Sequence, residues 1–150
     1  MWGSRQLRCF LYAAIAVVAL YGTWSQNLHY FTDFSPATTV AAFIAFVIDI
    51  KANPATRSIG VDIMLFALAA MIWMVQEARR LGIRFVWLYI LFAFSIAISV
   101  TFPLFLIARE ARLAETGEPM TGTGLLPGDT LGLLAAGGLI VWICWFLSVT

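Results

Sequence analysis

Two carboxylates, Asp62 and Glu77, lie towards the two ends of an apolar run within residues 57–84 and could do acid–base chemistry. On a single helix, a separation of fifteen residues corresponds to about 22 Å along the axis. The two carboxylates therefore cannot act as a pair on one substrate atom. Each one has to be interpreted by itself.

Glu77 is followed by Arg79 and Arg80 in the segment "EARRLGIR". A carboxylate at the C-terminus of a helix is unfavourable with the helix dipole, and neighbouring arginines offset this cost. We expect Glu77, Arg79 and Arg80 to form a structural ion cluster at the membrane surface, closing a tight hairpin.

Asp62 lies inside the apolar run, about 7 Å beyond Arg57 by helical rise. A carboxylate within a membrane helix is costly unless it is paired or protonated, so it is a functional candidate by default. Asp62 is the candidate catalytic residue, acting as an acid. The alternative is a structural bond to loop residues at the same membrane face, with four possible partners: Lys51, Arg57, His29 and Asn53.

The histidine of this chain, His29, lies four residues before Asp33. That spacing can bind a metal on a helix, but two ligands do not make a site, and we predict no metal and no cofactor. Polar residues near this face are still candidates for ligand binding: His29, Asp33, Asn53 and Arg57.

The composition is that of a membrane protein. The chain has 150 residues, of which 62% are hydrophobic and 11% charged. Soluble domains are close to half apolar and about one quarter charged. The net charge of +1 gives no footprint for nucleic acid. We expect an all-α, multi-pass protein of the cell (inner) membrane, whose first environment is the lipid bilayer.

Four apolar runs are long enough to cross a membrane, which takes about 20 residues. The predicted single membrane domain has crossing helices at about residues 7–24, 58–78, 85–113 and 129–149, with a loop at 114–128. A short apolar helix at about 36–50 is capped by Ser35 and begins with Pro36. Its length favours an interfacial or re-entrant helix, which gives four crossings.

The distribution of basic residues leaves five crossings as the alternative. With four crossings and an internal N-terminus, five basic residues lie inside (Arg5, Arg8, Arg79, Arg80 and Arg84) and four lie outside (Lys51, Arg57, Arg109 and Arg112). With five crossings the count becomes six against three. Neither the orientation nor the path of residues 37–49 follows from the sequence alone.

Small residues recur at helical spacing, for example Ala13 and Ala16 in the first run and Gly132 and Ala136 in the last. Such faces allow helices in lipid to approach closely. They favour a packed bundle, and they could equally contact a membrane-protein partner or a second copy of the chain.

Several segments resemble one family of small bacterial membrane proteins, catalogued as domain-of-unknown-function family 2834. The most specific are Asn53-Pro54 followed by Asp62, the "EARR" hairpin, and "FPLF" followed by Arg109-Glu110. The resemblance covers about residues 7–113, and residues 114–150 look like an extension. It implies a membrane class and no activity.

Three functions are compatible with these residues. The preferred one is an accessory or structural subunit that packs against lipids or a larger membrane complex. An enzyme that modifies lipids or isoprenoids would use Asp62 as its acid, but the sequence carries no nucleotide loop, nucleophile pair or cofactor motif. A small oligomeric transporter would use the short helix and the broken segment "NPATRS".

Overall fold

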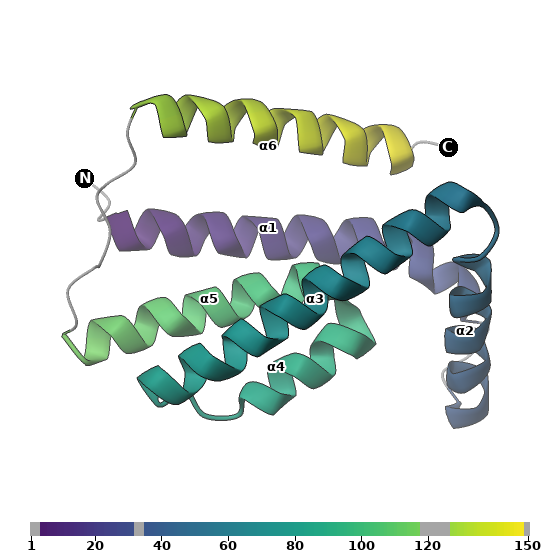
Figure 1. Ribbon diagram of the computed structural model, residues 1–150, viewed down its shortest axis with the longest axis horizontal. Helices are drawn as coiled ribbons and strands as arrows, with labels where there is room; N and C mark the ends of the chain where they lie inside the picture. The colour runs from purple at the N-terminus through teal and green to yellow at the C-terminus, as the bar shows by residue number, and fades with distance from the viewer. Residues whose placement is uncertain (1–3, 32–34, 118–126, 149–150) are drawn as a thin grey trace. The chain divides into compact units, whose positions relative to one another are not determined.

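The computed structural model of the protein describes residues 4–31, 35–117 and 127–148, and their regular structure is helical throughout, which confirms the predicted all-α class. The chain divides into two units, residues 1–117 and residues 118–150. The first unit contains α1 (Ser4–Asn27), η1 (Leu28–Tyr30), α2 (Pro36–Asp49), α3 (Pro54–Leu81), α4 (Val86–Phe92), η2 (Ala93–Ala97) and α5 (Ile98–Glu115), and the second contains α6 (Pro127–Ser148) (Figure 1).

The helices have the length and the surface of membrane helices. In the described part of the chain, three segments are long and apolar enough to cross a membrane: Arg5–Tyr30, Pro54–Leu81 and Val86–Glu115. Two shorter apolar helices cover Pro36–Asp49 and Leu131–Trp145. Large apolar side chains point outward along these helices, as Val17 (67% exposed) and Leu134 (69% exposed) do. Such a surface is stable in lipid rather than in water, and the chain is therefore a membrane protein.

Local capping fixes where the helices of the first unit begin. Ser35 accepts a hydrogen bond from the backbone of Thr38, so α2 starts at Pro36. Asn53 and Thr56 form a reciprocal capping box with Pro54 at the first helical position. This box starts α3 at residue 54, four residues before the predicted start at 58.

The predicted crossing helix at residues 85–113 is wrong as a single helix. The π-helical turn η2 ends at Ala97, whose extended backbone (φ −179°, ψ 144°) begins a new helix, α5. The rings of Tyr89 and Phe105 lie 5.7 Å apart. A straight helix would separate these residues by about 24 Å. The segment is therefore a helical hairpin that reverses at Ala97, and Figure 1 shows α4 and α5 as its two arms.

Long-range contacts give the direction of each helix in the first unit. Arg8 contacts Glu110, and the Trp24 side chain donates to the Ile96 carbonyl at 3.2 Å, so α1 runs antiparallel to the second arm of the hairpin. Trp73 packs on Phe102, and the Arg112 side chain donates to the carbonyl of Leu81, so α3 runs parallel to α5. It follows that α1 and α3 are antiparallel, and that the link containing α2 leaves and re-enters at one end of the unit.

These directions bring seven arginines to one end, formed by the start of α1, the turn between α3 and α4, and the ends of α3 and α5. We call it the arginine-rich end; it carries Arg5, Arg8, Arg79, Arg80, Arg84, Arg109 and Arg112. Lys51 and Arg57 lie at the opposite end. The predicted placement of Arg109 and Arg112 with these two residues is wrong, because it assumed that residues 85–107 cross the membrane once.

A small apolar core holds α3 against the hairpin. It consists of five buried side chains: Met74, Ala78, Val86, Ile90 and Phe105. Gly82 makes the connection tight, since it ends α3 in the left-handed conformation (φ +65°) that favours glycine. Because Met74 and Phe105 lie in the same core, Glu77 of α3 lies next to Arg109 of α5.

Candidate functional site

The polar centre of the first unit starts at Glu77, in the last turns of α3. Its carboxylate accepts two hydrogen bonds from Arg80, both at 2.8 Å, and one from Arg109 Nε at 2.6 Å. Of the predicted cluster, Glu77 and Arg80 thus form an ion pair. Arg79 is exposed and makes no hydrogen bond or ion pair with any described residue, and Arg109 of α5 takes its place.

Glu110, the next residue of α5, lies against α1. Arg8 donates to both of its carboxylate oxygens, at 3.3 Å and 2.8 Å. Arg5 Nε lies 3.6 Å from the same carboxylate. The Glu110 side chain is only 5% exposed, so this carboxylate is buried between two guanidinium groups.

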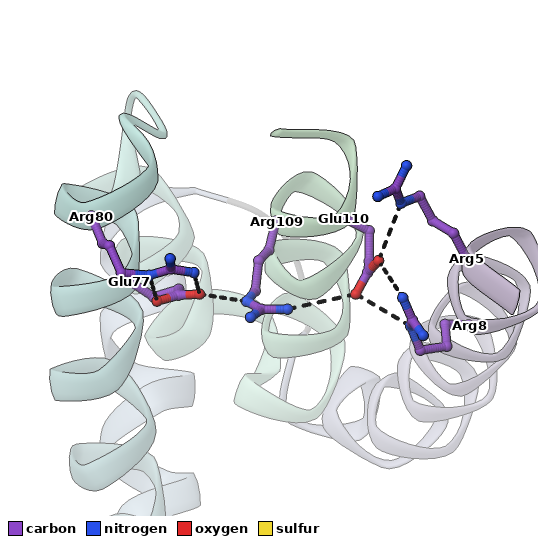
Figure 2. Close-up of polar contacts among 6 residues, drawn as sticks. All are labelled: Arg5, Arg8, Glu77, Arg80, Arg109 and Glu110. Carbon is purple, nitrogen blue, oxygen red and sulfur yellow. Dashed lines mark hydrogen bonds and ion pairs between the residues drawn. The ribbon is translucent and has the colours of Figure 1, made fainter. Parts of the chain in front are cut away.

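Arg109 connects the two carboxylates. Besides Glu77, its guanidinium faces Glu110 at 3.6 Å and the indole ring of Trp73 at 5.9 Å. The result is a chain of alternating charges that runs from α3 through α5 to α1 (Figure 2). We call it the charge ladder; it runs through Arg80, Glu77, Arg109 and Glu110, and Glu110 then pairs with both Arg8 and Arg5.

The ladder is suited to a structural role, because its ion pairs join α3, α5 and α1. Each buried carboxylate accepts charge-assisted hydrogen bonds, which are the stronger kind and satisfy the charge that burial would otherwise penalise. Four arginines against two glutamates leave an excess of two positive charges. The ladder thus binds three helices together at the arginine-rich end of the first unit and leaves that end cationic.

Sequence reasoning missed four members of the ladder: Arg5, Arg8, Arg109 and Glu110. The pair Arg109-Glu110 was visible as a motif, but a straight helix placed it at the wrong face. One signal was available. The predicted charge count of five against four is too even for a membrane protein, because loops on the cytoplasmic side carry a clear excess of basic residues.

Asp62 has surroundings opposite to those of Glu77. It lies in the first half of α3, is exposed, and makes no hydrogen bond or ion pair with any described residue. None of residues 54–66 is buried. The side chains around Asp62 are apolar and exposed, as Val61 (61%) and Leu65 (63%) show. Asp62 is therefore a lone carboxylate among exposed apolar side chains, although the Ile50 side chain packs against α3 at nearby Gly60.

The binding candidates near Asp62 do not converge. Asn53 caps α3 through Thr56. His29 and Arg57 are exposed and form no hydrogen bond or ion pair with a described residue. Asp33 lies outside the described residues. The contact that does form here joins Tyr30 to Asp49 of α2, with a hydrogen bond of 2.8 Å.

The described residues form no metal site, and the two cavities described below lie far from Asp62. Within the described residues, no three side chains of the metal-binding types come together. Two open cavities of about 400 and 440 Å³ flank the turn between α3 and α4, at the far end of α3 from Asp62. The first is lined by Arg84 and Arg112, the second by Arg79, Arg84 and Trp87.

Comparison with known proteins places most of the first unit in one family. A family model with the description "Protein of unknown function DUF2834" matches residues 11–111. This range includes the first arm of the hairpin, residues 98–111 of the second arm, and every member of the ladder except Arg5 and Arg8. A search of curated proteins and a search of solved structures gave no match.

Proposed function

Because the chain belongs to the family described as "Protein of unknown function DUF2834", whose description assigns no activity, we propose a role from the chain's own geometry. The protein is an accessory or structural subunit of the inner membrane. The charge ladder holds its helices together at one face, and the first half of α3 docks a partner membrane protein through Asp62.

The observation that carries this proposal is the exposed apolar stretch of α3, residues 61–66, that carries Asp62. A carboxylate among lipid-facing apolar side chains is costly unless a partner charge or a hydrogen-bond donor meets it. Glu77 and Glu110 each have arginine partners within the chain, whereas Asp62 has none among the described residues. A basic or hydrogen-bonding side chain of a second protein would satisfy Asp62 and cover the apolar residues beside it.

The distribution of charge supports a multi-pass topology with the arginine-rich end in the cytoplasm. Seven basic residues lie at that end and two, Lys51 and Arg57, at the other. Such a bias matches the rule that cytoplasmic segments are enriched in Lys and Arg. In this topology α1 and α3 cross the membrane, the hairpin enters from the cytoplasm and returns, and α2 stays at the outer face.

Site-specific photocross-linking in native membranes tests the docking surface. A photoreactive amino acid replaces Leu65, which is exposed and one helical turn from Asp62. We expect a discrete product larger than the monomer, and we expect Asp62→Ala to abolish it. Met74, which is fully buried, is the matched control position and should give no such product.

The same variants separate docking from folding. Asp62→Asn and Asp62→Ala should leave the melting temperature of the purified protein unchanged, because the side chain has no described partner to lose. Cross-links from Leu65 to lipid alone, or a protein product that is insensitive to Asp62→Ala, would overturn the proposal.

A further inference from the structure

The turn between α3 and α4 carries a cationic surface that the charge ladder does not use. Both open cavities of the arginine-rich end meet at this turn and share Gly82, Ile83 and Arg84. Arg112 reaches over the turn, since its Nη2 would lie 3.3 Å from a Cβ added to Gly82. The turn is therefore a shallow groove between guanidinium groups.

Two of the arginines in this groove have no counter-charge among the described residues. Arg79 and Arg84 are exposed and form no ion pair or hydrogen bond with a described residue. Arg112 is shared between the carbonyl of Leu81 and the carboxylate of Glu115. Among the described residues, three positive charges thus face one exposed carboxylate, and the groove attracts anions.

Apolar side chains continue directly from the charged groups. Phe85 is 72% exposed and Trp87 is 62% exposed, and both line the second cavity with Arg79 and Arg84. Phe85 has a left-handed backbone (φ 62°), a conformation that residues other than glycine rarely adopt. Tryptophan is also enriched where headgroups meet acyl chains.

We propose that this groove binds an anionic phospholipid of the cytoplasmic leaflet. The headgroup phosphate lies between Arg84 and its neighbours Arg79 and Arg112, and the acyl chains run along Phe85 and Trp87. Guanidinium groups match phosphate in geometry and charge, and basic pockets at the cytoplasmic side of membrane helices suit lipid headgroups. The site uses neither Asp62 nor a partner protein, and it rests on the proposed function only for the orientation that puts the arginine-rich end in the cytoplasm.

Native mass spectrometry of the full chain tests the site. The protein is released from nanodiscs containing equal parts phosphatidylglycerol and phosphatidylcholine. We expect wild type to retain phosphatidylglycerol preferentially. Arg84→Gln should lower that retention about fivefold, because one basic residue near an anionic surface contributes about 1 kcal/mol. Combination with Arg79→Gln should lower it further.

Arg57→Gln is the matched control. Arg57 is also exposed and without a described partner, but it lies at the opposite end, away from both cavities. It should retain phosphatidylglycerol as wild type does. Unchanged retention in Arg84→Gln, or an equal loss in Arg57→Gln, would overturn the site. An unchanged melting temperature of Arg84→Gln shows that a loss of lipid is not a loss of fold.

Inorganic phosphate distinguishes a lipid from a free anion. If the acyl chains contribute, excess phosphate should leave phosphatidylglycerol bound, and Phe85→Ser should weaken retention. Complete displacement of the lipid by phosphate alone, with no effect of Phe85→Ser, would overturn the assignment to a lipid.

Discussion

At the scale of single residues, Arg109 has the central position in the first unit. It is the residue of the ladder that contacts both buried carboxylates, and it also lies over the ring of Trp73. Arg80, in contrast, contacts Glu77 from the exposed side, with 48% of its side chain accessible. The two arginines therefore differ in what their removal leaves behind.

We expect Arg109→Gln to destabilise the purified protein by about 2 kcal/mol, in the range of a lost hydrogen bond to a charged group. Arg80→Gln should cost less, because water can replace an exposed partner. Thermal unfolding in detergent would compare the two variants. Equal effects of Arg109→Gln and Arg80→Gln would show that the ladder does not centre on Arg109.

At the scale of elements, the helical hairpin determines how the helices of the first unit are arranged. The sequence carries no local signal for its reversal. Residues 86–115 form one continuous apolar segment with a single proline, Pro103, which lies inside α5 rather than at the reversal. The reversal is at Ala97, in an extended conformation that any residue adopts. It is stabilised by non-local packing, such as Tyr89 on Phe105 and the bond from Trp24 to Ile96.

The start of α2 was predictable for the opposite reason. Its signals are local: a serine cap and a first-turn proline act within a few residues of Pro36. The pairing of Glu77 with Arg80 is local as well, at a spacing of three residues along one helix. Arg8 and Glu110 meet across 102 residues of sequence, and their contact depends on the reversal. Helix composition alone could not reveal it.

Paired cysteines test the hairpin. In a protein with Cys9 and Cys144 replaced by serine, Tyr89→Cys with Phe105→Cys should be joined within one chain by a short bifunctional reagent. The matched control places cysteines at Ile59 and Val75, also sixteen residues apart but on the continuous helix α3, where they are separated by about 24 Å. Gel mobility after proteolysis between the two sites is the measurement. A straight helix at residues 86–115 would leave both pairs unlinked.

At the scale of the whole molecule, the first unit has a strong charge asymmetry between its two ends. The folded-back hairpin returns Arg109 and Arg112 to the end that carries Arg5 and Arg8. Seven basic residues at one end against two at the other is a large bias. With the hairpin folded back, the distribution of basic residues therefore fits the rule that cytoplasmic segments are enriched in Lys and Arg.

Single cysteines in the same cysteine-free background test that orientation. Arg84→Cys and Ala114→Cys should be protected together from a membrane-impermeant thiol reagent in intact cells, and Lys51→Cys should react. Lysis should make all three positions reactive. Reaction of Ala114→Cys together with Lys51→Cys would instead indicate a single crossing by residues 86–115, and it would contradict the hairpin.

The hairpin also determines whether the number of membrane passages before Gly117 is odd or even. Its first arm, residues 86–97, is only about 18 Å long, and the second arm ends where the first began. The pair therefore adds an even number of passages, and the chain reaches Gly117 on the face where α1 starts. Deleting both arms together would preserve the sidedness of everything downstream. Deleting the first arm alone would leave residues 98–115, a helix about 27 Å long, as a single passage that inverts it.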